Sequence, residues 1–400
     1  MQAPKLLHNV FAKNIPSVHK KRLDCINDGV SALLKSKKLT LTALGRHCDT
    51  NAVMRSNIRK FDRLLGNQKL HAEIPQFYMT MNSQFWPTQT RPWIHVDWSC
   101  LSSKQNLYVL RASLSMQGRG LVVYEEVHDK AKENHHPTHK VFLHNLKKVL
   151  PASQAPVLVT DAGFRGKWFK EVRRLGYDFI GRLRNNNLVK LGDQQSWMKS
   201  KSLYNHASTT PKHLGSGLLT LRNKLACQFV IYKGKKKYRK KLTKTRKISR
   251  ASKSRRHALS GEEPWLLVTS LNDSRMLANH VVRIYSQRMQ IEENFRDTKS
   301  QRYGFGLNES GTKTPARMAV LLLLAAIATL SCWLVGLTVK RNGKAANYQA
   351  HSSSFTSVLS IVYLGCEAIR SGYKIVKYQF YEALRLLCQL PLTEGAGYES

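Results

Sequence analysis

The sequence predicts an α/β fold flanked by helical regions, and three observations support this. The β-rich runs 93–98, 107–116 and 120–128 follow one another with turn-like residues between them. Residues 138–184 then alternate between helical and strand-like patterns. The chain of 400 residues is 42% hydrophobic, enough to bury a sizeable core. Three consecutive strands before the alternation indicate a sheet with an antiparallel start.

Residues 1–84 are expected to form short helices. Apolar residues in 53–65 recur near the helical period. The other faces of that helix carry four basic residues, Arg55, Arg59, Lys60 and Arg63. Two short helices with a basic second one resemble a small DNA-binding unit, but a basic solvated helix explains the pattern equally well.

Residues 85–184 contain two aspartates that follow short apolar strands. Asp97 stands in "HVDWS" and Asp161 in "VLVTDAGF". A carboxylate at the carboxyl end of a buried strand borders the crevice where open α/β sheets bind ligands. The alternative is that each aspartate only caps a helix or forms a turn.

Residues 185–276 are expected to form a β-rich insertion that is strongly basic. No acidic residue occurs between Asp193 and Glu262, and 14 of the 24 residues from Lys233 to Arg256 are Lys or Arg. Runs of like charge are often disordered tails, but this one is internal and flanked by strand-like sequence. We expect a loop that grips nucleic-acid phosphates.

The stretch 285–300, "YSQRMQIEENFRDTKS", is expected to form one helix with a polar stripe. At helical spacing, five of its residues fall within about 80° of one another: Tyr285, Arg288, Glu292, Arg296 and Lys299. Ile284, Ile291 and Phe295 lie to one side and can dock the helix on a sheet. Glu293 is about 100° away from Glu292 and is not expected to act with it.

Composition indicates a polyanionic partner. The chain has 65 Lys and Arg against 25 Asp and Glu, a formal charge of +40, which favours DNA or RNA. Seven cysteines without a CxxC pair argue against a zinc module or disulfide framework and suit a reducing cytosol. In "HHPTH" a helix cap at Thr138 is favoured over a zinc site.

Residues 318–339 form a run of 22 residues without a charge. By length the run could span a bilayer. A buried helix of a large core is favoured, because a lone span after a strongly basic soluble portion would be unusual. Thr329, Ser331 and Gly336 would let a neighbouring helix approach closely. We expect no membrane association.

Two strand-end aspartates and a helical glutamate suit one chemistry. Hard oxygen ligands favour Mg²⁺, which completes its coordination with water and substrate phosphate. Two such ions about 3.5 to 4 Å apart can drive an in-line phosphodiester displacement. Arg288 and Lys299 would hold the substrate backbone and favour the charge that develops on phosphorus.

These residues resemble a known family. Tyr285, Arg288, Glu292 and Lys299 reproduce the Y-(2)-R-(3)-E-(6)-K signature of bacterial cut-and-paste DDE transposases of the insertion-sequence-four group, hairpin-forming type. "VDWS" and "VTDAGF" look like its two aspartate motifs.

The resemblance implies an RNase H-like mixed sheet interrupted by the β-rich insertion. It implies five parts: an N-terminal helical DNA-binding region (1–84), the first part of the catalytic core (85–184), the inserted β-rich basic domain (185–276), the second part of the core with the Glu292 helix (277–339) and a C-terminal helical region (340–400).

The same resemblance assigns site residues. Asp97, Asp161 and Glu292 would be catalytic and hold two Mg²⁺ ions, with Mn²⁺ as a substitute. The DNA end would be contacted by three signature residues, Tyr285, Arg288 and Lys299. Trp265 would stack on a flipped thymine, and Met289 would wedge into the gap. The alternatives are that Trp265 is a core residue and Met289 a helix-packing residue.

The implied partner is double-stranded DNA, both the terminal inverted repeats of a mobile element and the target. The protein would act as a homodimer in a synaptic complex, in the bacterial cytoplasm at the nucleoid. One alternative is an RNase H-like nuclease without strand transfer. Another is a non-catalytic nucleic-acid-binding protein whose acids are structural.

Overall fold

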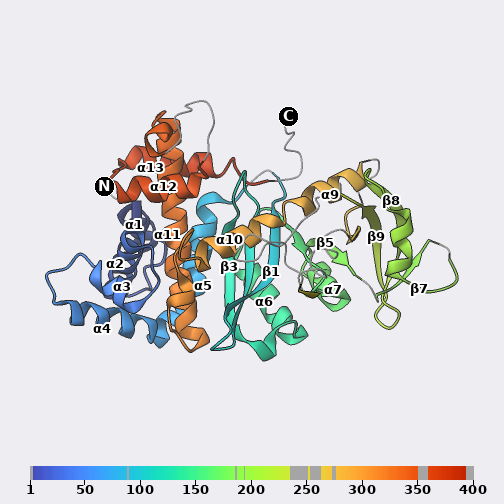
Figure 1. The fold of residues 1–400 in the computed structure, drawn as a ribbon, viewed down its shortest axis with the longest axis horizontal. Helices are drawn as coiled ribbons and strands as arrows, with labels where there is room; N and C mark the ends of the chain where they lie inside the picture. The colour runs from blue at the N-terminus through green and yellow to red at the C-terminus, as the bar shows by residue number, and fades with distance from the viewer. Residues whose placement is uncertain are drawn as a thin grey trace. The chain divides into compact units, whose positions relative to one another are not determined.

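The computed structural model describes residues 3–87, 90–184, 187–192, 194–234, 251–252, 263–272, 276–349 and 359–392. Contacts divide the chain into two compact units (Figure 1). Unit 1 comprises Met1–Pro156 and Met289–Ser400, and unit 2 comprises Val157–Arg288. The run 235–250 and residues 253–262 lie outside the described residues, and they include most of the basic run 233–256 that was predicted to grip phosphates.

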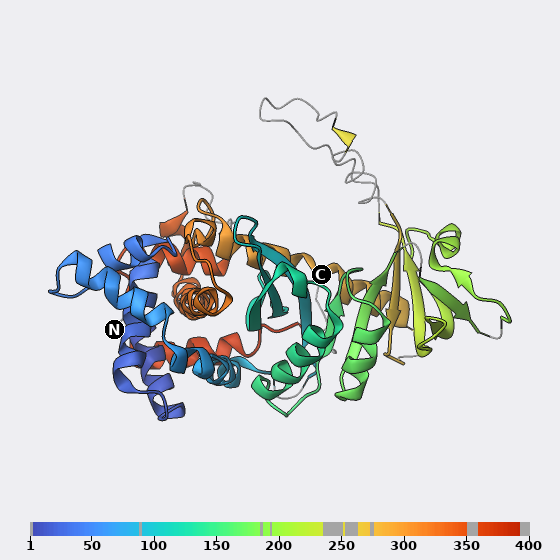
Figure 2. The ribbon, with the colours of Figure 1, turned by 90° about the horizontal axis from the view of Figure 1, so that it is seen from below.

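Unit 1 contains a helical part built from both ends of the chain. Its helices are α1 (Ala3–Asn14), α2 (Lys20–Ser36), α3 (Leu41–Arg46), α4 (Met54–Leu65), α5 (Gln68–Phe85), α11 (Pro315–Arg341), α12 (Ile361–Arg370) and α13 (Lys377–Leu387). Seen end-on in Figure 2, α11 has helices on most sides and the sheet on the remaining side. It contacts α1, α2, α4, α5, α12 and α13, and the strand Leu121–Asp129.

Burial explains the composition of α11. It is the one helix in the described part of the chain that is long and apolar enough to cross a membrane, and 89% of its most apolar window is buried. Close approach to α12 is possible because both helices use glycine. A Cβ on Gly365 would stand 1.8 Å from the Cys332 carbonyl oxygen, and one on Gly336 would stand 2.1 Å from that of Ile361. The prediction of a buried core helix with Gly336 at a close approach is confirmed.

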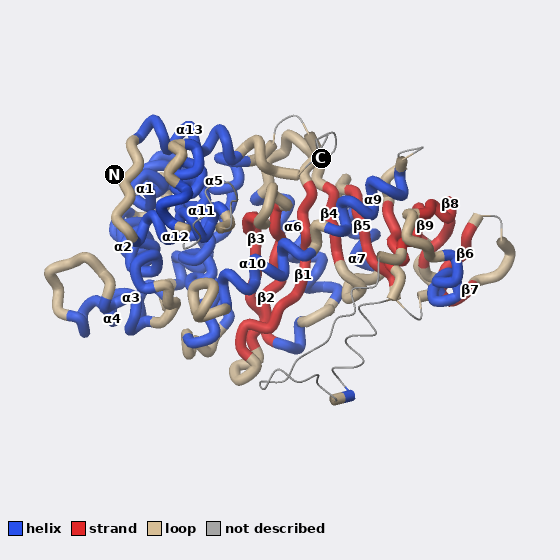
Figure 3. The backbone as a smooth tube through the Cα atoms, turned by 45° about the horizontal axis from the view of Figure 1, so that its top comes forward, coloured by secondary structure: helices blue, strands red, loops and turns tan. Residues whose placement is uncertain are grey.

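Unit 1 also contains a three-stranded antiparallel sheet in the order β3-β2-β1. Its strands are β1 (Trp93–Ser102), β2 (Leu107–Leu114) and β3 (Leu121–Asp129), and its helices are α6 (His136–Val149) and α10 (Met289–Lys299). The two helices cover opposite faces of β1. Trp98 points to α6, where its indole nitrogen bonds His139, and Ser99 points to α10, where it bonds Lys299. Figure 3 shows α6, α10 and β1 as backbone.

Unit 2 contains a mixed sheet in the order β4-β5-β10-β9-β8-β6-β7. The strands are β4 (Val157–Thr160), β5 (Asp178–Leu183), β6 (Leu188–Leu191), β7 (Met198–Lys199), β8 (Lys212–Leu219), β9 (Leu225–Tyr232) and β10 (Trp265–Thr269). The pair β4 and β5 is parallel and is connected by α7 (Gly166–Arg174). Five further strand pairs of this sheet are antiparallel: β10 with β5, β10 with β9, β9 with β8, β8 with β6 and β6 with β7. Helix α9 (Leu277–Ser286) packs on β8, β9 and β10.

Short 3₁₀ helices complete the described elements: Lys130–Lys132, Ser200–His206, Leu307–Glu309 and Ala345–Tyr348. The predicted α/β fold is confirmed, with an antiparallel start, a β-rich segment after β5 and helices at both ends. The division into five parts remains a prediction.

Two predictions of local structure were wrong. The stretch 285–300 is not one helix, because α9 ends at Ser286 and α10 begins at Met289. Between them the amides of Gln287 and Arg288 donate to carbonyls three residues back, at 3.2 and 3.0 Å, which tightens the turn. Helix α6 is not capped at Thr138. It begins at His136, with Pro137 in its first turn.

Candidate active site

Asp97 lies in the middle of β1, on the face that α10 covers. Side chains alternate along a strand, so Asp97 shares this face with His95 and Ser99. The carboxylate is half-buried, and its Oδ1 accepts the Trp98 amide at 2.8 Å. Its cross-strand neighbour on β2 is Arg111. The local hydrogen bond agrees with a structural role for Asp97 but does not require one.

Glu292 lies in the first turn of α10, where a carboxylate is favoured by the positive end of the helix dipole. It is exposed, and Arg296 and Lys299 follow on the same side at spacings of four and seven residues. Glu293 points elsewhere and pairs with Arg119 at 2.5 Å. The expectation that Glu293 does not act with Glu292 remains a prediction.

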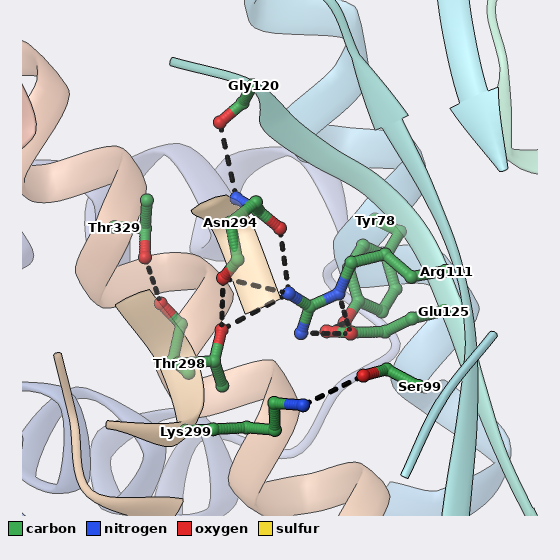
Figure 4. A network of polar contacts seen from close by, with 10 residues as sticks. Tyr78, Ser99, Arg111, Gly120, Glu125, Asn294, Thr298, Lys299 and Thr329 are labelled. Carbon is green, nitrogen blue, oxygen red and sulfur yellow. Dashed lines mark hydrogen bonds and ion pairs between the residues drawn. The ribbon is translucent and has the colours of Figure 1, made fainter. Parts of the chain in front are cut away.

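Lys299 joins the helix of Glu292 to the strand of Asp97 (Figure 4). Its Nζ donates to Ser99 Oγ at 2.8 Å and to the Cys100 carbonyl oxygen at 3.3 Å. Burial, followed by the charge of Arg111, lowers the pKa of Lys299, while Cys100 and Asp97 oppose the shift. Unit 1 therefore brings together the elements that carry two of the three predicted acids.

Asp161 follows β4 in unit 2 and is half-buried. Its Oδ1 accepts the Gly163 amide at 2.7 Å, the pattern of an Asx turn. Asp161 therefore forms a turn, as the alternative interpretation expected. Its carboxylate has a second oxygen, which could bind a cation.

Tyr285 on α9 is buried rather than part of an open polar stripe, with 3% of its surface exposed. Burial raises the pKa of its hydroxyl, the charges of Arg288 and Arg182 lower it, and the charge of Asp161 raises it again. In unit 2, three charged residues therefore influence the pKa of Tyr285: Asp161, Arg182 and Arg288.

Arg182 was missed by the sequence analysis. Its side chain lies on β5, is 11% exposed, and donates to the carbonyls of Glu263 and Pro264 at 3.4 and 3.3 Å. The available signal was an arginine inside "DFIGRL", an otherwise apolar strand. Burial lowers the pKa of its guanidinium, and the charge of Tyr285 is the largest opposing effect.

The two residues predicted to handle a flipped base are both accessible. Trp265 is half-buried in an aromatic cluster, with its ring centroid 4.9 Å from that of Tyr285 and 5.6 Å from that of Tyr232. Met289 is 46% exposed at the start of α10. Met289 is therefore not a buried packing residue, and Trp265 is not a fully buried core residue.

The acids fit a hard divalent cation by their chemistry. Asp97, Asp161 and Glu292 supply carboxylate oxygens, which Mg²⁺ and Mn²⁺ prefer. Within each unit, over the described residues, no three His, Cys, Asp or Glu side chains are grouped closely enough to hold a metal ion. Asp97 and Glu292 belong to unit 1, whereas Asp161 belongs to unit 2.

Comparison with known proteins assigns the class. Asp161 directly follows β4, as predicted, whereas the prediction that Asp97 ends a strand was wrong, because β1 continues to Ser102. The profile described as "Transposase DDE domain" matches residues 82–330, more than half of the chain, and the protein belongs to this family. The RNase H-like fold class is thereby confirmed. No curated protein matches the chain.

Membership has direct consequences. The protein is a transposase, and its family binds DNA and generally uses divalent metal ions. Proteins of this family are generally soluble and cytoplasmic, in agreement with the buried position of α11.

Proposed function

We propose that this protein excises and inserts a mobile DNA element. It cleaves DNA at terminal inverted repeats, passes through a hairpin on the element's end and joins the freed 3′ end to target DNA. The carrying observation is the bond from Lys299 to Ser99, because it joins the helix of Glu292 to the strand of Asp97 within a chain of the DDE family. The full Y-R-E-K signature supports membership of the insertion-sequence-four group.

Asp97, Asp161 and Glu292 would hold two Mg²⁺ ions, for which Mn²⁺ would substitute. When bound, the ions supply activation of a water or 3′-hydroxyl and stabilisation of the leaving oxygen. The protein's own groups bind and orient the DNA. Arg288 would hold the phosphates of the DNA end, and the buried Tyr285 would support that end from beside Arg288. Lys299 would add positive charge next to Asp97.

The aromatic cluster of unit 2 suits a flipped base. Trp265 keeps part of its ring accessible, and stacking of a base on such a ring contributes about 1 to 3 kcal/mol. Met289 offers an exposed, flexible apolar side chain that could fill the gap left in the duplex.

The complete reaction implies two DNA ends held together, so we propose a homodimer in a synaptic complex at the bacterial nucleoid. The formal charge of +40 supports contact with long stretches of phosphate. A nuclease without strand transfer shares the same acids, and the two functions differ in their products. A non-catalytic binding role would leave DNA uncut.

The test compares two adjacent carboxylates. Purified protein is incubated with Mg²⁺ and a short duplex that ends in the inverted repeat flanking the gene. Glu292→Gln and Asp97→Ala should abolish nicking, hairpin and strand-transfer products. Glu293→Gln changes a neighbouring carboxylate that pairs with Arg119, and it should retain them. Products that persist in Asp97→Ala would refute the assignment. Cleavage without joining would favour the nuclease.

A further inference from the structure

A buried ion pair lies on the sheet beside Asp97. Arg111 on β2 is 1% exposed, and its Nε donates to Glu125 Oε2 on β3 at 2.7 Å. The other oxygen of Glu125 accepts the hydroxyl of Tyr78, on α5, at 2.8 Å. Burial, then the charge of Glu125, raises the pKa of Tyr78, which keeps the hydroxyl as a donor.

The strand register places this pair in one row with Asp97. Asp97 is directly opposite Arg111, and Arg111 is directly opposite Glu125. Directly opposed residues project from the same face with their Cβ atoms about 4.5 to 5.5 Å apart. Both Nε and Nη2 of Arg111 lie 2.7 Å from Glu125 Oε2, so Glu125 is a close counter-ion of the guanidinium in this row.

The free end of the guanidinium reaches across to α10 (Figure 4). Arg111 Nη1 donates to the Asn294 side-chain oxygen at 2.7 Å, to the Asn294 carbonyl at 3.2 Å and to Thr298 Oγ1 at 3.2 Å. The guanidinium carbon also lies 4.8 Å from the ring centroid of Phe295. One buried cation thus contacts three residues of the helix that carries Glu292.

Three further hydrogen bonds hold the same side of α10. Asn294 Nδ2 donates to the Gly120 carbonyl at 3.2 Å. Gln290 both donates to the Met116 carbonyl, at 2.8 Å, and accepts the Met116 amide, at 3.1 Å. Residues 290, 294 and 298 are spaced four apart, so they form a buried polar line along the helix. Directional bonds along a line fix the rotation and the axial position of a helix, which apolar contact alone does not.

We propose that Arg111, with Glu125 as its counter-ion, is the positioning residue of the active site: it sets the rotation and height of α10, and so places Glu292 and Lys299 against the Asp97 strand. The proposal rests on the proposed function only for the role of Glu292. A carboxylate ligand that is misplaced by a fraction of a turn binds a metal ion more weakly even when the protein remains folded.

The test weakens the contact without leaving a charge unpaired. Asn294→Ala removes one acceptor of Arg111 and the bond to Gly120 but keeps the Arg111–Glu125 pair. The matched control is Asn82→Ala. Asn82 is also buried, and its amide donates to two backbone carbonyls, of Val123 and Val149, neither of which belongs to α10.

The first readout needs neither metal nor DNA. Amide hydrogen exchange is measured by mass spectrometry on peptides covering residues 289–299. Asn294→Ala should speed exchange in α10 about tenfold, since a bond that anchors the helix is lost. Asn82→Ala should leave α10 within about twofold of the parent. Unchanged exchange in Asn294→Ala, or an equal change in both variants, would overturn the proposal.

The second readout is the Mg²⁺ dependence of cleavage. Asn294→Ala should raise the half-maximal Mg²⁺ concentration about tenfold, as loss of a group that orients a ligand does. DNA binding without divalent metal should stay within about twofold. Asn294→Asp, which keeps the acceptor, should recover part of the loss. An unchanged Mg²⁺ requirement would overturn the positioning role. If Asp97→Ala still cleaves, the proposed function fails, and the exchange experiment still decides whether Arg111 holds α10.

Discussion

Two helices that follow each other in the chain are held in their units by different kinds of contact. The buried residues of α9 are all apolar or aromatic: Leu277, Val281, Val282, Ile284 and Tyr285. Those of α10 include three polar side chains, Gln290, Asn294 and Thr298, beside Ile291 and Phe295. The change occurs across two residues, Gln287 and Arg288.

The difference between α9 and α10 shows that contacts that stabilise a helix need not be the contacts that fix its position. Apolar burial scales with area and has no preferred direction, so the apolar residues of α9 stabilise its docking without by themselves fixing its rotation. Hydrogen bonds from a buried guanidinium are directional, and they fix α10 at the cost of desolvating a charge. The helix with the directional contacts is the one that carries the proposed metal ligand. Functional groups require placement to about 0.5 Å, which favours this type of support.

The largest predicted effect comes from breaking the ion pair under α10. Arg111→Met leaves Glu125 charged, buried and without its main partner, and should cost about 3 to 5 kcal/mol of unfolding free energy. Arg111→Met combined with Glu125→Leu removes both charges and should be more stable than Arg111→Met alone. Urea denaturation followed by circular dichroism measures both.

Comparing the single and double variants tests whether Arg111 and Glu125 stabilise the fold as a pair. The two single changes should not add, because each removes the partner of the other. Additive losses in the combined variant would show that the Arg111–Glu125 contact is not an energetic unit. Truncating two buried apolar residues of α9 should destabilise the protein more than truncating one, because each truncation leaves a cavity.

A smaller effect on stability is expected on the opposite face of β1, where Trp98 bonds His139, a residue that can take up a proton. His139 accepts the Trp98 indole N–H at 2.9 Å. Burial, then the neighbouring His136, His135 and His128, lowers the pKa of His139 to about 4. An unfolded histidine has a pKa of about 6.5 and binds the proton first as the pH falls. Stability is therefore complete above pH 6.5 and declines toward pH 4, by about 3 kcal/mol for a shift of this size.

Urea midpoints between pH 4 and 7 test the titration. His139→Gln keeps an acceptor for Trp98 and does not titrate, so its stability should be nearly flat over this range. Titration of Glu126 contributes little to the change in stability between pH 4.5 and 7. Although burial opposes it, bonds from His128, Asn145 and Tyr124 lower its pKa, so its contribution is lost only below about pH 4.5. An equal decline in His139→Gln would refute the assignment to His139.

Much of the architecture was predictable from local pattern. The strands around Asp97 and Asp161, the helix α6 and the long core helix α11 all appeared as runs of the correct period. Ile284, Ile291 and Phe295 are buried as expected. These strands and helices could be predicted because the spacing of apolar and polar residues along the chain indicates which side of each element is buried. The signature acids were also visible because their types and spacing are unusual.

The features that were missed depend on contacts distant in sequence. The break at Gln287 and Arg288 contains no Gly or Pro, so no local signal marks it. Arg111 meets Asn294 across 183 residues, and Arg111 and Glu125 look like ordinary solvent-facing positions of two strands. The line Gln290, Asn294 and Thr298 was visible at helical spacing, but only the polar stripe through Glu292 was considered.

The smallest predicted effect distinguishes the two helices by activity rather than by stability. Ile284→Val removes one methylene from the apolar side of α9 and should cost about 1 kcal/mol. Thr298→Val keeps the shape of the side chain but removes the hydroxyl that accepts Arg111 Nη1, and it should cost a similar amount, about 1 kcal/mol. Urea midpoints should therefore be alike, whereas cleavage of the terminal repeat should slow several-fold only in Thr298→Val, because only that change loosens the helix carrying Glu292. Equal cleavage rates in the two variants would mean that polar docking of α10 contributes stability alone.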